Sequence, residues 1–142
     1  MGRNVDQQNK LYDILENDPR FPLAAYAAIH KGLDRTMRMK GVIGHVDGQE
    51  LALGMAGYLK AEYGPFAKSL LYGWGIRSTL DFGRLVFNLV ESGLMRKQDT
   101  DSIEDFSDVY DFEKTFNDRY DWLSEIRGEL GLAAPKPDPS SR

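Results

Sequence analysis

Acidic side chains crowd one stretch of the chain, and carboxylates are groups that bind cations and transfer protons. The stretch holds the carboxylates of Asp99, Asp101, Glu104, Asp105, Asp108 and Asp111. Such oxygens suit Ca²⁺, but an EF-hand loop needs an oxygen-bearing side chain at its fifth position and glycine at its sixth. Here those positions are Ile103 and Glu104. The spacing therefore predicts a solvated charge run and no metal site.

Other reactive side chains are few and scattered. The chain has no cysteine, and its two histidines, His30 and His45, have no metal-ligand partner at helical or finger spacing. No nucleophile motif, phosphate-binding loop or dinucleotide fingerprint occurs. We therefore expect no cofactor and favour a non-enzymatic protein. An enzyme stays open because catalytic groups can meet in space, and its pocket would then lie around Trp74, Tyr58 and His45.

A possible nucleic-acid reader lies on the segment after Ser78. Arg84 and Asn88 are one helical turn apart, and such side chains can read guanine and adenine edges. Asp81 precedes them in the first turn, where a phosphate would approach. The acidic stretch nearby is offset only by Arg96 and Lys97. Because DNA binders gain affinity by neutralising phosphates, these acids argue against nucleic-acid binding.

Helical periodicity predicts the elements that must position these groups. Helices are expected over residues 6–16, from Phe21-Pro22 through Lys40, after the N-cap pair Asp47 and Glu50, around Phe66 to Trp74, and from Ser78 to Gly93. The last has the clearest apolar stripe, formed by Phe82, Leu85, Val86, Leu89 and Val90. Residues 94–98 and 106–110 are predicted as two short strands flanking the acidic loop.

The fold class expected from this order is mainly α with a small β-hairpin, in a helical bundle with a winged-helix-like arrangement. One helical globular domain is expected over residues 1–130, ending in a helix over residues 111–130. Residues 131–142 are predicted to be a flexible proline-rich tail.

Two residues of that predicted last helix stand out. Arg119 falls close to the centre of its apolar stripe, which is unusual for a charged side chain. It either covers apolar surface with its stem or forms an ion pair with Asp108 or Asp111. Trp122 lies at the edge of the same stripe, as a core-edge residue or a contact for a partner.

Charge divides the chain into unequal halves. Residues 1–97 carry 13 Lys and Arg against 10 Asp and Glu, whereas residues 98–142 carry 5 against 12. A negative field of this kind repels polyanions. The polar N-terminal residues predict no signal peptide, and no apolar run approaches the roughly 20 residues of a membrane span. With no cysteine, the expected location is the cytoplasm.

Several runs of residues resemble an uncharacterised conserved-hypothetical protein family of planctomycete and verrucomicrobial bacteria. They are DPRF (18–21), HVDGQEL (45–51), WGIRST (74–79), DFG (81–83), VFNLVESGL (86–94) and DFSDVYDF (105–112). The resemblance covers roughly residues 10–118. It implies a bacterial, cytoplasmic protein and carries no activity, cofactor or site residue.

The sequence favours a non-enzymatic interaction or adaptor domain whose acidic hairpin face meets a basic protein surface. Two alternatives stay open: a winged-helix-like nucleic-acid regulator, and a small-molecule-binding protein or enzyme. The regulator requires the basic side chains to gather on one surface away from the acidic loop. Those side chains are Arg35, Arg38, Lys40, Arg77 and Arg84. The sequence makes no prediction of the oligomeric state.

Overall fold

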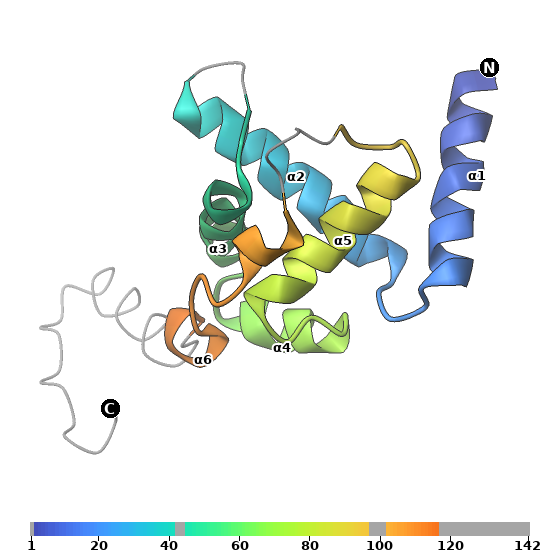
Figure 1. Cartoon of the computed structure of the whole chain (residues 1–142). Helices are drawn as coiled ribbons and strands as arrows, with labels where there is room; N and C mark the ends of the chain where they lie inside the picture. The colour runs from blue at the N-terminus through green and yellow to red at the C-terminus, as the bar shows by residue number, and fades with distance from the viewer. Residues whose placement is uncertain (1, 42–44, 97–101, 117–142) are drawn as a thin grey trace, which may run out of the picture.

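The computed structural model describes residues 2–41, 45–96 and 102–116, with side chains from residue 6 onward. In this part of the chain helices pack around one hydrophobic core, with α2, α3 and α5 at its centre and α1 along one side (Figure 1). The elements are α1 (Gly2–Asn17), α2 (Leu23–Lys40), α3 (Gly48–Tyr63), the 3₁₀ turn η1 (Gly64–Phe66), α4 (Ala67–Gly73), α5 (Thr79–Glu91), the 3₁₀ turn η2 (Ile103–Phe106) and α6 (Phe112–Thr115). The mainly α class is confirmed.

The helix boundaries follow capping chemistry. The Asp47 side chain accepts a hydrogen bond from the Glu50 N–H at 2.8 Å, and the Glu50 side chain accepts one from the Asp47 N–H at 3.3 Å, so the predicted capping box is present. At α5 the Ser78 side chain makes no capping bond. Instead Asp81 accepts from the Arg77 N–H at 2.8 Å. A first-turn carboxylate thus holds the backbone that leads into this helix.

Helices α2 and α3 approach each other closely through glycine. A Cβ added to Gly54 would lie 1.8 Å from the Thr36 Oγ1, and one added to Gly32 would lie 2.1 Å from the Met55 Sδ. A larger residue at Gly54 would meet the Cβ of Thr36 as well, at 2.9 Å, and one at Gly32 would force the Met55 side chain to move. The α2–α3 pair is therefore a tightly packed unit whose spacing is set by its smallest residues.

The predicted β-hairpin is wrong: within the described ranges no residue is in a strand. After α5, Gly93 takes a left-handed φ of 82° and the chain folds back on the helix end. The N–H groups of Leu94 and Met95 both donate to the Leu89 carbonyl, at 2.9 and 3.2 Å. These groups close the helix and are not available to a partner strand.

The second predicted strand is replaced by η2 and the turn that follows it. The Thr79 hydroxyl, buried in α5, donates to the Phe106 carbonyl at 2.5 Å and accepts from the Val109 N–H at 3.2 Å. A side chain thus satisfies backbone groups that a hairpin would pair across strands. With the hairpin absent, the winged-helix-like arrangement is also wrong.

The predicted last helix is described only at its start. α6 covers Phe112–Thr115, and the rest of the predicted span and the proline-rich segment lie outside the described residues. None of the helices described above is long and apolar enough to cross a membrane.

Candidate functional site

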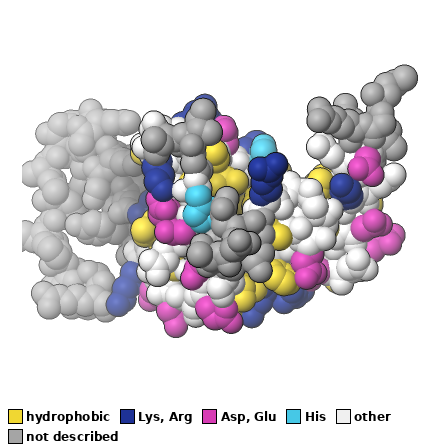
Figure 2. Space-filling view, turned by 45° about the horizontal axis from the view of Figure 1, so that its top comes forward, with side chains coloured by type: hydrophobic (Ala, Val, Ile, Leu, Met, Phe, Trp, Pro, Cys, Tyr) yellow, Lys and Arg dark blue, Asp and Glu magenta, His cyan; other side chains and the backbone are white. Residues whose placement is uncertain are grey.

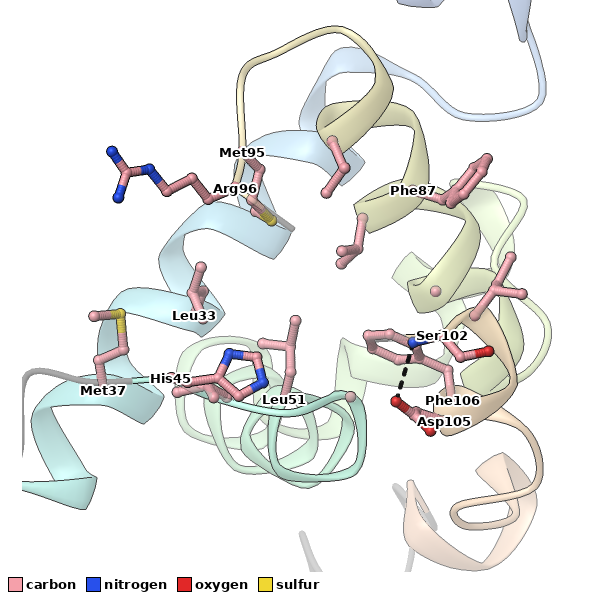
Figure 3. A pocket seen from close by; sticks show the side chains of 16 residues that line it. Leu33, Met37, His45, Leu51, Phe87, Met95, Arg96, Ser102, Asp105 and Phe106 are labelled. Atoms are coloured by element: carbon pink, nitrogen blue, oxygen red, sulfur yellow. Dashed lines mark hydrogen bonds between the residues drawn. The ribbon is translucent and has the colours of Figure 1, made fainter. Parts of the chain in front are cut away.

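A pocket of about 590 Å³ opens between α2, α3, α5 and η2. This volume falls within the range of roughly 300–1,000 Å³ typical of small-molecule sites. Its apolar lining comes from Leu33, Met37, Val46, Leu51, Val86, Phe87, Val90, Met95, Ile103 and Phe106, with the glycines Gly48 and Gly83. Figure 3 shows the labelled side chains arranged around this space. The pocket is the most developed candidate site in the described part of the chain.

Glycines allow η2 to close one side of the pocket. The Phe106 ring lies against α3 and α5, where a Cβ added to Gly83 would be 2.8 Å from the ring and one added to Gly48 would be 3.0 Å from it. Phe106 itself is only 5% exposed. The Thr79 hydroxyl bond to its carbonyl fixes η2 in this position. Residues that are far apart in the sequence therefore form one wall of the pocket.

The opposite walls come from helical stripes that the sequence predicted as core. On α5, Phe82, Leu85 and Leu89 are buried, whereas Val86 and Val90 are half-buried and line the pocket. On α2, Leu33 and Met37 are one turn apart and also line it. The apolar stripes of these two helices contain more residues than the core buries. The remaining apolar residues face the cavity.

Polar groups of the lining lie at the rim. His45, Arg96 and Ser102 are exposed, and Asp105 is half-buried. The Ser102 N–H donates to the Asp105 side chain at 3.2 Å, the bond drawn in Figure 3. The Ser102 hydroxyl in turn donates to Glu104. Asp105 and the neighbouring Glu104 thus accept hydrogen bonds from Ser102 within the same turn.

The acidic residues singled out from the sequence are divided by the structure. Asp99 and Asp101 lie outside the described residues. Glu104 and Asp105 stabilise η2, and Asp105 closes a capping box with Ser102. Asp108 is exposed with a left-handed φ of 49°. Asp105 is the one of these three described acids that lines the pocket.

The proposed ion pair of Arg119 lies outside the described residues, as does Trp122. Of its two candidate partners, Asp111 is the N-cap of α6 and accepts from the Glu113 N–H at 3.0 Å. Asp111 therefore already has a structural role. The pairing stays a prediction.

The basic side chains required for a nucleic-acid surface are mostly engaged by neighbouring groups, and Arg35 and Arg38 line one hollow between α2 and α3. Arg38 pairs with Asp34 at 2.6 Å, Lys40 with Glu50 at 2.8 Å, and Arg84 with Asp81 at 2.6 Å. Arg77 lies over the Tyr72 ring, and Arg35 lies beside Gly57 on α3. Figure 2 shows acidic and basic side chains interspersed on one face.

Asn88, the second residue of the predicted reading pair, is used internally. Its amide donates to Asp18 at 2.9 Å and to the Tyr26 hydroxyl at 3.0 Å. Asp18 also accepts two bonds from the Arg20 guanidinium, at 2.7 and 2.6 Å. The hydrogen bonds from Arg20 hold the pKa of Asp18 well below its usual range. This network joins α2 and α5 to the link after α1.

In the described part of the chain, the pocket expected around Trp74, Tyr58 and His45 does not form, because His45 lies apart from the other two, which both pack edge-on against Tyr63. His45 lines the pocket described above, Tyr58 lines a separate hollow between α2 and α3, and Trp74 packs edge-on against Tyr63 at 6.1 Å. Within the described residues, no group of three or more His, Asp or Glu could hold a metal ion. The sequence therefore identified His45 as a pocket residue but did not predict the apolar walls of the pocket.

No known protein family, curated protein or solved structure matches the chain. The bacterial family resemblance stays a prediction, and the site is interpreted from its own residues.

Proposed function

We propose that this protein binds a small, largely apolar molecule in the pocket between α2, α3, α5 and η2. One observation carries the proposal: a cavity of about 590 Å³ with apolar walls on three helices and polar groups at its rim. An apolar ligand entering it would remove its own surface and that of the walls from water. Each buried CH₂ contributes about 0.8 kcal/mol. We place this binding in the cytoplasm, in keeping with a cysteine-free sequence.

The walls suit ligands that vary in shape. Met37 and Met95 are flexible and polarisable, so they can adjust to different outlines. The wall formed by Phe106, by contrast, is held in place by the hydrogen bond from Thr79 to the Phe106 carbonyl. We therefore expect selection by ligand length and apolar area more than by a rigid outline.

Calorimetric titration with octanol, decanol and dodecanol tests the proposal. The wild-type chain should bind one molecule saturably, with affinity rising about fourfold per added CH₂ until the pocket is full. Val86→Trp places a large ring in the cavity and should abolish binding. Leu80→Trp is the matched control, because Leu80 is half-buried on the same helix outside the pocket lining.

A second pair of variants guards against misfolding. Met37 lines the pocket from α2, whereas Met39 on the same helix is 71% exposed and does not. Met37→Trp should weaken alcohol binding and Met39→Trp should not. The proposal would be overturned if the wild type, Val86→Trp and Met37→Trp bound the alcohols equally while circular dichroism showed intact helices. It would also be overturned if no alcohol bound to the wild type.

The expected protein partner with a basic surface stays a prediction. Of the acidic residues that the structure describes in η2 and at the start of α6, Asp105 and Asp111 serve in caps, and Glu104 and Glu113 accept hydrogen bonds from neighbouring side chains. Small-molecule binding is therefore the function that the geometry supports best.

A further inference from the structure

We infer that the ligand of this pocket is a single-chain amphiphile with an anionic head group, held with that head group at the rim beside Arg96. This inference rests on the proposed function and adds the chemical class of the ligand. It follows from where the polar and charged groups of the lining lie.

The first step is the orientation of the ligand. The deep lining is apolar and closed to solvent: Leu51 is 3% exposed and Phe106 is 5% exposed, and Gly48 and Gly83 are buried. An unpaired polar group would lose its water there without compensation. The exposed His45, Arg96 and Ser102 lie at the opening. A ligand that matches both the apolar interior and the polar rim of the pocket places its apolar body inside and its polar head group at the rim.

The second step is the sign of the head group. Among the described residues that line the pocket, Asp105 is the one carboxylate, and its Oδ2 accepts the Ser102 N–H; the adjacent Glu104 accepts from the Ser102 hydroxyl. Arg96 is different: it is an exposed residue of the lining, and none of the described residues forms a hydrogen bond or ion pair with it. Among the described lining residues, the Arg96 guanidinium can therefore still donate hydrogen bonds to a ligand, whereas the Asp105 carboxylate already accepts one. The rim therefore favours an anion on the Arg96 side.

The position of the Arg96 guanidinium relative to the cavity determines how it can act on a bound ligand. The Arg96 side chain belongs to the pocket lining, and in Figure 3 its guanidinium lies outside the cavity, beyond Met95. A head group emerging from the pocket on this side meets the guanidinium in solvent. Because the charge is exposed, its contribution is modest and salt-dependent. Apolar burial sets the affinity, and Arg96 selects among head groups.

Three probes of equal chain length test the inference: decanoate, decanol and decylamine, each as free monomer at low salt. We expect the wild type to bind decanoate more tightly than decylamine. Arg96→Gln should weaken decanoate binding about threefold and leave decanol unchanged. Arg77→Gln is the matched control, since Arg77 is an exposed arginine outside the pocket lining. Added salt should reduce the difference between the wild type and Arg96→Gln.

The two proposals fail in different ways. If decanol binds and is blocked by Val86→Trp, but decanoate binds equally to the wild type and Arg96→Gln, the head-group inference is overturned and the apolar pocket stands. Tighter binding of decylamine than of decanoate would also overturn it and would assign the head group to Asp105. If none of the three binds, both proposals fall.

Discussion

The two sides of helix α2 differ in how closely they meet their neighbours. Toward α3, Gly32 and Gly54 leave no room for even one added carbon atom. Toward α5, the helices touch where the Tyr26 hydroxyl accepts from Asn88, and two turns later Leu33 and Met37 face a cavity. Small residues in register close one interface, whereas larger aliphatic residues that do not interdigitate leave the other open. The difference separates a part of α2 that stabilises the fold from a part available to a ligand.

Two methionines test this comparison with the largest expected effect. Met55 is 1% exposed on the closed side, so Met55→Ala should lower the free energy of unfolding by about 3 kcal/mol. Met37 is half-buried beside the cavity, and Met37→Ala should cost less than about 1 kcal/mol. Urea unfolding measures both. Equal losses would show that the two sides of α2 are packed alike.

A glycine substitution tests the closed side directly. Gly54→Ala should destabilise the chain by about 2 kcal/mol, because the new Cβ would meet the Thr36 side chain. Gly73→Ala is the control, since no atom outside its own helix lies within 4 Å of a Cβ there. It should be neutral or slightly stabilising through helix propensity. Adding Thr36→Ala to Gly54→Ala should recover part of the loss, and no recovery would contradict the proposed clash.

The attachment of η2 tests how the open side is closed at its end. Thr79→Val keeps the buried shape but removes the hydroxyl that bonds to Phe106 and Val109. We expect a loss of about 1.5 kcal/mol and weaker decanol binding, because the Phe106 wall is no longer fixed. Thr79→Ser retains the hydroxyl and should bind decanol like the wild type. Unchanged binding by Thr79→Val would show that the wall is held by packing alone.

The contact between α2 and α5 should depend on pH through Asp18. Asp18→Asn should lower the free energy of unfolding by about 1 kcal/mol near pH 7. The pKa of Asp18 is lower in the folded chain than in the unfolded chain, where it is about 3.9. Its stabilisation is therefore full above about pH 4 and lost as the pH falls toward the folded value.

Unfolding measured near pH 7 and near pH 3 checks the sign. The gap between the wild type and Asp18→Asn should narrow at the lower pH. Asp13→Asn, at an exposed carboxylate of α1, should show no such change. A gap that widens toward acid would contradict the proposed role of the Arg20 hydrogen bonds.

The sequence predicted the helices well because their signals are local. The apolar stripe of α5 and the Asp47–Glu50 capping box can be identified within one segment. The hairpin was predicted in error partly because a second local signal was missed. Ser102 and Asp105 have capping-box spacing, which favours a helical turn. The bond from Thr79 to Phe106 joins residues 27 positions apart, and no local pattern predicts it.

The pocket was harder to predict for a different reason. Val86 and Val90 have the same residue type and helical spacing whether they fill a core or line a cavity. Which role they take depends on where α2 and η2 lie, and the place of η2 depends on Gly48, Gly83 and Phe106 together. Among the polar residues named in the sequence analysis, His45 and Asp105 reach the rim together with Arg96. None of them was expected to face an apolar cavity.

Methyl-resolved NMR during titration with decanol tests the central claim most directly. We expect progressive, saturable shifts for the methyl groups of Leu33, Leu51, Val86 and Val90, which line the pocket. The methyl groups of Leu59 and Leu71, buried in the core away from it, should stay unchanged. Shifts spread evenly over both sets, or no shift at the pocket residues at saturating decanol, would contradict it.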